Sequence, residues 1–241
     1  MGISFSDNTN KTGIVEQTRD KARVDSTHWA TSKIVNSCNN WINHIFTRGK
    51  ILDRRFQLDD TNHTTLPEGT IDLIANQDTY SFLTDQQGNR ITNLTRIDIM
   101  DSTGLYRQLI PIDMAQLGGI AIEEWNKTAG LPIYYDKIAD NIIRLYPKPA
   151  TTVVNGIKYF FQRAPHYFVA TDTTLQPGVA DDLHEGFIIK SAFDAADTLG
   201  LSTLNSLTRQ LAAQEQVIDD YFSIRETDEP NIIIPRYHRP R

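Results

Sequence analysis

The residues whose types and spacing come closest to a catalytic motif are His184 and Glu185, which begin like a zinc-peptidase helix. That motif, H-E-x-x-H, places two histidines on one helix face, where both can bind Zn²⁺. The second histidine would stand at position 188, which is isoleucine. Because one ligand is missing, we interpret the acidic run at residues 181–185 as a first helical turn, where carboxylates complement the helix dipole.

The other potentially reactive groups also have structural interpretations. Cys38 falls on the apolar stripe of a predicted helix, between Ile34 and Trp41, which favours a small buried side chain over a nucleophile. The sequence contains no phosphate-binding loop, dinucleotide-binding motif or nucleophile elbow. We therefore expect no enzyme, no metal site and no cofactor. Five further histidines show no ligand spacing: His28, His44, His63, His166 and His238.

The run Tyr159-Phe160-Phe161 allows two interpretations. Aromatic side chains can stack on nucleic-acid bases, but only Lys158 and Arg163 flank this run, so packing in a β-sheet core is favoured. The formal net charge of −6 also argues against tight binding of nucleic-acid phosphates. No apolar segment approaches the roughly 20 residues of a membrane-spanning helix, so no membrane association is expected.

Apolar residues at helical spacing predict the elements that frame the chain. A first stripe supports a helix that starts near Ser26, capped by Asp25 or Ser26, and ends at Gly49. A shorter helix is expected before it, at residues 13–24. The stripe comprises Ile34, Val35, Cys38, Trp41, Ile42, Ile45 and Phe46.

Helical periodicity returns in the last third of the chain. One helix is expected at residues 183–199, with an acidic cap at Asp181 or Asp182 and an end at Gly200. A second helix is expected at residues 202–222.

Between the helical regions, short β-branched segments separated by turn signals predict strands at residues 70–74, 79–83, 94–100 and 105–112. A short helix, interrupted by Gly118-Gly119, is expected at residues 113–125.

Residues 134–165 predict a two-stranded ribbon. Its first strand ends at Tyr146, because Pro147 and Pro149 cannot donate to a ladder. The dipeptide Asn155-Gly156 is a hairpin signal, and an aromatic strand follows it at residues 157–161.

Together these elements predict an α+β fold, in which a helical bundle (N-terminal helix plus C-terminal helical hairpin) is interrupted by a small antiparallel β-sandwich or barrel module. Trp41 and Phe187 lie centrally on their stripes, so we expect one helical core to contain both. The expected organisation is a flexible arm at residues 1–13, helical parts at 14–50 and 178–226, a β-rich domain at 51–177 and an extended basic tail at 227–241.

Several short motifs occur in an order that resembles the head-to-tail adaptor proteins of tailed bacteriophages. The predicted ribbon carries L-Y-P-x-P at residues 145–149 and R-x-P at residues 163–165. Residues 77–82 are similar to a Q-x-x-Y-x-L strand, and residues 107–113 are similar to an R-x-L-x-P-I-[SD] element. Residues 181–201 look like the first C-terminal helix of these proteins, which ends in Leu-Gly-Leu.

The resemblance implies a structural virion protein, assembled in the host bacterial cytoplasm and located in the neck of the virion. Such a protein forms a ring, most often of twelve copies, beneath the portal protein. There it continues the DNA channel and offers a docking platform to the tail or to a second neck-ring protein. Double-stranded DNA would pass through the lumen without specific binding during genome packaging and ejection.

Two alternatives remain open. One is a tail-proximal neck or stopper ring from the same assembly. The other belongs to a different class, a receptor- or carbohydrate-binding β module.

The C-terminal tail is the candidate docking site for the portal protein. Residues 231–241 hold three arginines and no acidic residue, and the rest of the chain carries a formal charge of −9. An extended apolar segment can pair with a sheet edge or fill a groove, and arginines can bind carboxylates on a partner. The alternative is a tail folded back onto its own acidic body. The candidate docking residues are Ile232, Ile233, Ile234, Arg236, Tyr237, Arg239 and Arg241.

Overall fold

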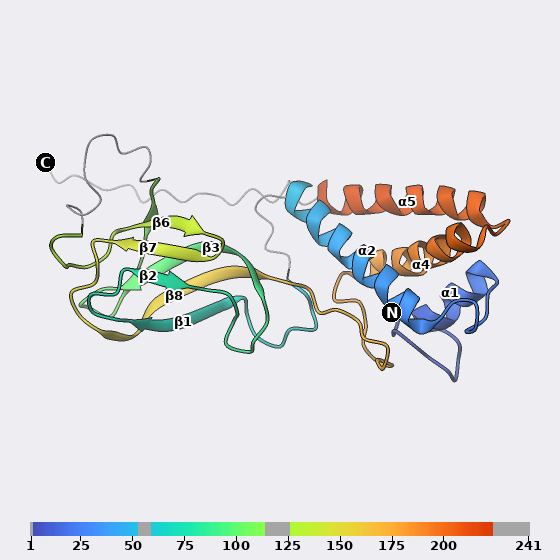
Figure 1. The fold of residues 1–241 in the computed structure, drawn as a ribbon, viewed down its shortest axis with the longest axis horizontal. Coiled ribbons are helices and arrows are strands. Elements are labelled where there is room, and N and C mark those ends of the chain that lie inside the picture. Colours follow the sequence, from blue (N-terminus) through green and yellow to red (C-terminus); the bar gives the residue numbers. More distant parts are fainter. Residues whose placement is uncertain (1, 53–58, 114–125, 224–241) are drawn as a thin grey trace, which may run out of the picture. The chain divides into compact units, whose positions relative to one another are not determined.

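The structure, a computed structural model, describes residues 2–52, 59–113 and 126–223, and the chain divides into two compact units (Figure 1). The helical unit combines Met1–Leu58 with Tyr167–Arg241, and the β unit comprises Asp59–His166. Helices thus precede and follow a β module in the sequence, which confirms the predicted α+β class.

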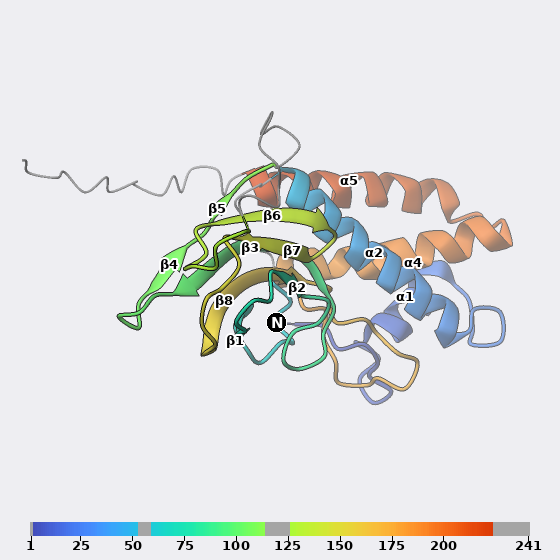
Figure 2. The ribbon, with the colours of Figure 1, turned by 60° about the vertical axis from the view of Figure 1, so that its left-hand side comes forward.

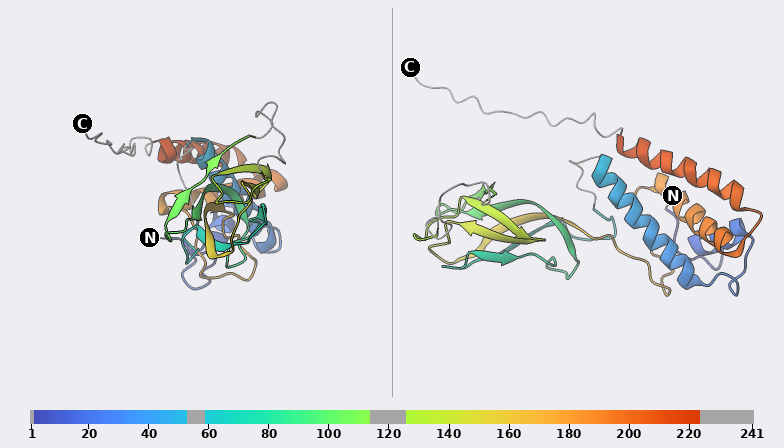
Figure 3. Two further views of the ribbon diagram at one scale, coloured as in Figure 1. Left: turned by 90° about the vertical axis from the view of Figure 1, so that its left-hand side faces the viewer. Right: turned by 45° about the horizontal axis from the view of Figure 1, so that its top comes forward.

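The described part of the helical unit contains four α-helices and one 3₁₀ turn. They are α1 (Ile14–Ala22), α2 (Thr31–Leu52), η2 (Asp181–Leu183), α4 (His184–Leu199) and α5 (Leu204–Ser223). Helix α4 packs against α1, α2 and α5. Helices α1 and α5 lie on opposite sides of α4 (Figures 1 and 3).

The core of the helical unit is built around α4. Trp41 of α2 and Phe187 of α4 belong to one buried cluster, as the two apolar stripes predict, and they are 2 % and 0 % exposed. Gly186 allows this close approach of the two helices. A Cβ at that position would lie 2.6 Å from Trp41 Nε1, so a larger residue would push α4 away from α2.

The predicted ends of the first long helix differ from the observed ones. Helix α2 begins at Thr31 because the Asp25 carboxylate instead organises a preceding turn, where it accepts hydrogen bonds from the backbone N–H groups of Thr27 and His28, both at 2.9 Å. The predicted end at Gly49 is also wrong. Gly49 is buried inside the helix, where its missing side chain makes room for Phe222.

At the other end of the chain, one predicted helix boundary is confirmed and one is wrong. Gly200 ends α4 in the left-handed conformation, with φ 64°. Neither Asp181 nor Asp182 caps this helix through its side chain. Both residues lie in the 3₁₀ turn that leads into it.

The first residues are bound to the helical unit, which differs from the flexible arm predicted for residues 1–13. Phe5 is fully buried and stacks on Phe168 with the ring centroids 4.8 Å apart. The Phe5 backbone N–H donates to the Leu175 carbonyl at 2.7 Å. An apolar anchor and backbone hydrogen bonds together hold this segment, although its sequence is mostly polar.

In the described residues, the β unit consists of two four-stranded sheets. The first has the order β1-β8-β3-β4 with antiparallel neighbours, and the second has the order β2-β7-β6-β5, in which only β5 and β6 are parallel. The strands of the first sheet are β1 (Glu68–Leu73), β8 (Val153–Arg163), β3 (Ile91–Met100) and β4 (Tyr106–Gln108). Those of the second sheet are β2 (Thr79–Ser81), β7 (Ile142–Tyr146), β6 (Tyr134–Ala139) and β5 (Ile110–Pro111).

The two sheets stack on each other and enclose one apolar core (Figure 2). Ile97, Tyr159 and Phe161 of the first sheet pack with Tyr80 and Leu145 of the second, and none of these side chains is more than 4 % exposed. The β unit is therefore a sandwich, one of the two architectures predicted for it.

The predicted two-stranded ribbon is wrong. Strands β7 and β8 belong to different sheets, because the segment between them carries the chain from one sheet to the other. Asn155 and Gly156 lie within β8 rather than in a hairpin turn. Ile71 pairs with Ile157 and Leu73 pairs with Val153, so the dipeptide sits in a β-bulge, where Asn155 takes a φ of 51°. Of the helix predicted at residues 113–125, all but the first residue lie outside the described part of the chain.

Candidate functional site at the two ends of the β unit

Arg163 is the most unusual side chain of the β unit. It is the last residue of β8 and follows Ile157, Tyr159 and Phe161 on the core-facing side of that strand. Its side chain is 0 % exposed, although a guanidinium is always charged. A buried charge requires partners with close geometry, so its surroundings are a site in their own right.

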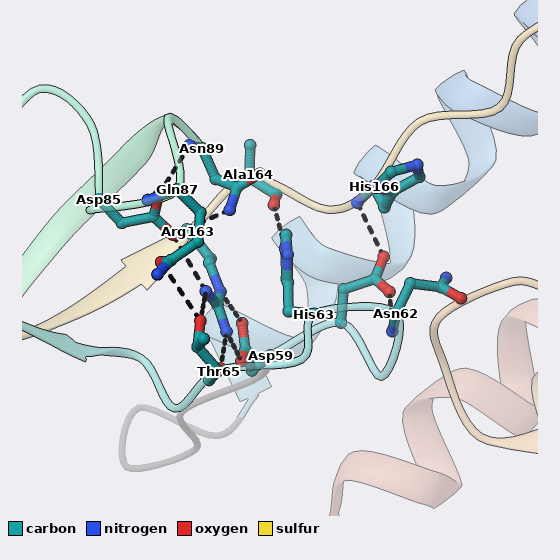
Figure 4. A network of polar contacts seen from close by, with 11 residues as sticks. Asp59, Asn62, His63, Thr65, Asp85, Gln87, Asn89, Arg163, Ala164 and His166 are labelled. Carbon is teal, nitrogen blue, oxygen red and sulfur yellow. Dashed lines mark hydrogen bonds and ion pairs between the residues drawn. The ribbon is translucent and has the colours of Figure 1, made fainter.

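The partners of Arg163 come from segments far away in the sequence (Figure 4). Asp59 accepts from Nε at 2.8 Å and from Nη2 at 2.7 Å, which is the two-pronged geometry that suits a guanidinium. Asp85, whose side chain is 1 % exposed, accepts from Nη1 at 3.0 Å. Thr65 contributes its hydroxyl, at 3.2 Å from Nη1, and its carbonyl oxygen, which binds Nη2. Hydrogen bonding to Asp59 is the main reason that the pKa of Arg163 is raised.

Asp85 is positioned by its own loop between β2 and β3. Its carboxylate accepts hydrogen bonds from the backbone N–H groups of Asn89 at 2.7 Å and Gln87 at 3.0 Å, and from the Asn89 side chain at 2.9 Å. Burial acts to raise the pKa of Asp85. The hydrogen bonds from Asn89, Arg163 and Gln87 together outweigh burial, so the pKa lies below its ordinary value and the group is ionised.

A second set of contacts joins the first and last residues of the β unit. The buried carboxylate of Asp60 accepts from the backbone N–H groups of Asn62 and His166, both at 2.8 Å. His63 Nε2 lies 3.2 Å from the Ala164 carbonyl oxygen, with its ring edge-on to that of His166. The Arg163 network and these contacts thus hold the two ends of the β unit side by side (Figure 4).

The other motif residues also hold strands in place. Tyr80 is buried and its hydroxyl accepts from the Ile74 backbone N–H at 2.9 Å. Arg107 Nε donates to Asp101 at 2.6 Å, across the turn between β3 and β4, and Leu109 is 2 % exposed. These residues organise a scaffold and present no reactive group.

His184, the residue most like a metal ligand, is a structural core residue. Its Nδ1 accepts from the Ile3 backbone N–H at 3.2 Å and its Nε2 lies 3.0 Å from the Val179 carbonyl oxygen. The first contact needs an acceptor and the second a donor, which a ring nitrogen pair can supply together. Both nitrogens are thereby engaged. Glu185 forms an ion pair with Lys21 at 3.2 Å.

The remaining candidate groups are not arranged for catalysis. Cys38 is fully buried, and burial raises the pKa of its thiol, which disfavours the nucleophilic thiolate. Among the described residues, no group of three or more His, Cys, Asp or Glu side chains could hold a metal ion. No helix in this part of the chain is long and apolar enough to cross a membrane.

The aromatic run in β8 is divided between the two faces of its sheet. Tyr159 and Phe161 lie in the core, as the packing interpretation predicts. Phe160 lies on the opposite face, with Arg96 and Lys158 5.5 Å and 5.1 Å from its ring centroid. Asp98 and Glu68 pair with these two cations at 2.7 Å and 3.0 Å, so the cluster is neutral and offers no net attraction to phosphate.

The seven residues predicted to dock the portal protein all lie at 224–241, outside the described residues. Sequence reasoning missed the partnership of Arg163 with Asp59 and Asp85. One signal was available, because an arginine at the fourth core-facing position of an alternating strand requires buried carboxylates.

No curated protein matches the chain. The sequence model of one family, described as SU10 adaptor protein, matches residues 14–233. The match runs from α1 through the whole β unit and beyond α5, and therefore covers both units of the fold. The chain belongs to the SU10 adaptor protein family.

Proposed function

We propose that this protein is a head-to-tail adaptor that forms a ring under the portal protein of a tailed phage. The observation that carries the proposal is the family match, which spans nearly the whole chain. The order of the motifs at residues 77–82, 107–113, 145–149 and 163–165 supports it independently. In this role the protein is part of the virion neck, and it is assembled in the host cytoplasm.

The mechanism is geometric and electrostatic. A contact between two different faces of neighbouring copies, repeated around an axis, closes a ring, which we expect to contain twelve copies. The ring continues the DNA channel of the portal. The chain outside residues 231–241 carries a formal charge of −9, and an acidic lumen repels phosphates, so that DNA slides without binding during packaging and ejection.

The described structure suits a component that must keep its shape under load. The buried Arg163 network ties the last strand of the β sandwich to the first residue of the unit, Asp59, and to Asp85. The sandwich core contains side chains from both sheets. A platform for a tail or a second neck ring needs this kind of rigidity, because a loosely packed unit would not hold its partner in register.

The tail at residues 231–241 is the proposed portal-docking arm. Ile232, Ile233 and Ile234 are β-branched and suit addition to a sheet edge or insertion into a groove. Arg236, Arg239 and Arg241 can each present a planar guanidinium to carboxylates of the portal.

Negative-stain electron microscopy tests the proposal. The protein is imaged alone and after mixing with the portal protein of the same phage. Rings with a central channel, stacked on one face of the portal, are the expected result. Monomeric particles that never attach to the portal would contradict it.

A further inference from the structure

The two sequence segments of the helical unit carry opposite net charges. Lys and Arg exceed Asp and Glu by three in residues 2–52, whereas Asp and Glu exceed Lys and Arg by seven in residues 167–223. Part of this difference is neutralised inside the unit. Lys21 pairs with Glu185 at 3.2 Å, and Arg48 binds Asp219 with two contacts of 2.6 and 2.7 Å.

Three cations of the first segment gather in one place. A surface concavity of about 570 Å³ on α1 is lined by Lys11, Arg19 and Arg23. Within the described part of the chain, no carboxylate forms an ion pair with any of the three. Arg19 donates to neutral groups, the Thr31 hydroxyl at 3.0 Å and the Trp29 carbonyl oxygen at 3.4 Å.

Two carboxylates also line the concavity. Glu16 is occupied, because it accepts from the Ser6 hydroxyl at 2.7 Å and the Asp7 backbone N–H at 2.9 Å. Asp20 is exposed to solvent. The three cations outnumber the two acids, so the concavity carries a net positive charge in an otherwise acidic protein and favours a carboxylate-rich ligand.

We propose that this concavity, on α1, binds the acidic segment at residues 226–229 of a second copy of the chain. Glu226, Asp228 and Glu229 supply three carboxylates within four residues, directly after α5. Arg225 precedes this run and residues 230–233 contain no charged group, so residues 225–229 carry a net charge of −2 within five residues.

A chain cannot place all three of these carboxylates in its own concavity. Helix α5 ends at Ser223, next to the C-terminal end of α2, where Phe222 packs against Gly49. The concavity lies toward the other end of α2, where Arg19 binds Thr31. The 18 residues from Thr31 to Gly49 span about 27 Å of helix. The six residues from Ser223 to Glu229 extend over about 20 Å at most, and the three to Glu226 over about 10 Å. Binding of the whole acidic segment must therefore occur between copies.

The concavity lies near one end of α2 and the last described residue of α5 lies near the other end. The contact would therefore join two different faces and repeat from copy to copy. Such a heterologous contact builds a closed ring or a filament rather than a symmetric pair. The inference rests on the proposed ring and names the contact that links its neighbours.

The test uses a fluorescent peptide of residues 223–231, which is titrated with the full-length protein. The protein carries Glu226→Gln, Asp228→Asn and Glu229→Gln, so that its own acidic segment does not compete with the peptide. Saturable binding is expected. Adding Lys11→Gln and Arg23→Gln, two side chains at the rim of the concavity, is expected to weaken it about fivefold or more, since each exposed ion pair contributes modestly. Lys33→Gln, an exposed cation of α2 outside the concavity, is the matched control and is expected to leave the affinity unchanged.

Two outcomes overturn the inference: no saturable binding at about 1 mM protein, or equal binding by the Lys11→Gln/Arg23→Gln protein. Thermal melting of each variant checks that the helical unit is folded. The outcome is separable from that of the proposed function. If the Lys11→Gln/Arg23→Gln protein forms rings on the portal as well as the parent protein does, this contact is contradicted and the adaptor role stays intact. If the peptide binds but no rings form with the portal, the adaptor role is contradicted and the contact stays intact.

Discussion

The ring of Phe222 in α5 lies directly against the backbone of Gly49 in α2. A Cβ at position 49 would stand 2.8 Å from Phe222 Cζ, closer than non-bonded carbon atoms come in folded proteins. The pair fixes the distance between α2 and α5 near the C-terminal ends of both helices.

Gly49→Ala tests this contact. Alanine favours a helix by about 1 kcal/mol over glycine, so an uncrowded site would be stabilised. Here the added methyl group must displace a fully buried ring, and we expect a net loss of about 1–3 kcal/mol in the free energy of unfolding. Urea denaturation measures it. The control is Ser32→Ala on the exposed side of α2, which should change stability by less than about 0.5 kcal/mol. A stabilised Gly49→Ala protein would refute the close packing.

Trp41→Ala tests the shared core of α2 and α4. Removing this side chain, which is 2 % exposed, should cost about 3–5 kcal/mol and lower the melting temperature strongly. Val154→Ala, at a side chain that is 71 % exposed, should leave the melting temperature nearly unchanged. If Trp41→Ala melts like the parent protein, Trp41 is not part of the core.

Asp85→Asn tests the buried ion pair. The substitution leaves Arg163 with only one carboxylate, and we expect a loss of about 3 kcal/mol in the free energy of unfolding. Asp140→Asn, at an exposed carboxylate of the same unit, is the control and should have little effect. Equal stability of the two variants would show that Asp85 contributes nothing to the network.

The same network predicts a dependence on acid. The folded-state pKa of Asp85 lies below its ordinary value of 3.8, so its contribution is complete above that value and is lost as the pH falls through the folded-state pKa. The urea midpoint of the parent protein should therefore be steady from about pH 7 to 5 and fall below about pH 4. In Asp85→Asn this fall should be smaller. An identical fall in both proteins would assign the acid sensitivity to other carboxylates.

Deletion of residues 231–241 tests the docking arm. All the described residues of the two buried cores lie between Ile3 and Phe222, so we expect the melting curve to remain nearly unchanged. Co-purification with the portal protein should be abolished. Replacing Arg236, Arg239 and Arg241 with glutamine separates the contribution of charge from that of the isoleucines. Full-strength binding by the truncated protein would move the docking surface elsewhere, most simply to α4 and α5.

The sequence predicts those features that depend on local periodicity. The stripe around Trp41 and the one around Phe187 each repeat at helical spacing, so both helices and their common core follow from pattern alone. Gly200 ends its helix as expected because a positive φ is needed there. Gly49 gives the same sequence signal for a helix end, but it lies inside α2, where it makes room for the ring of Phe222.

Features that depend on distant partners are not visible in the same way. Asn155-Gly156 is a hairpin signal in isolation, but β8 pairs with β1 and β3, and the dipeptide becomes a bulge. Arg163 finds Asp59 at a separation of 104 residues and Asp85 at a separation of 78. No local pattern links residues that far apart, so the identity of the partners of Arg163 is visible only in the fold.

The hydrogen bond between Asp60 and the His166 backbone has a consequence for chain entropy. An unstructured insert as long as Asp59–His166 would cost the helical unit about 2 kcal/mol more in loop closure than an insert of roughly ten residues. Because the inserted unit brings its own two ends together, the helices that flank it experience only a short connection once the sandwich has formed. The sandwich can therefore vary in length at its far loops during evolution with almost no penalty to the bundle that carries it.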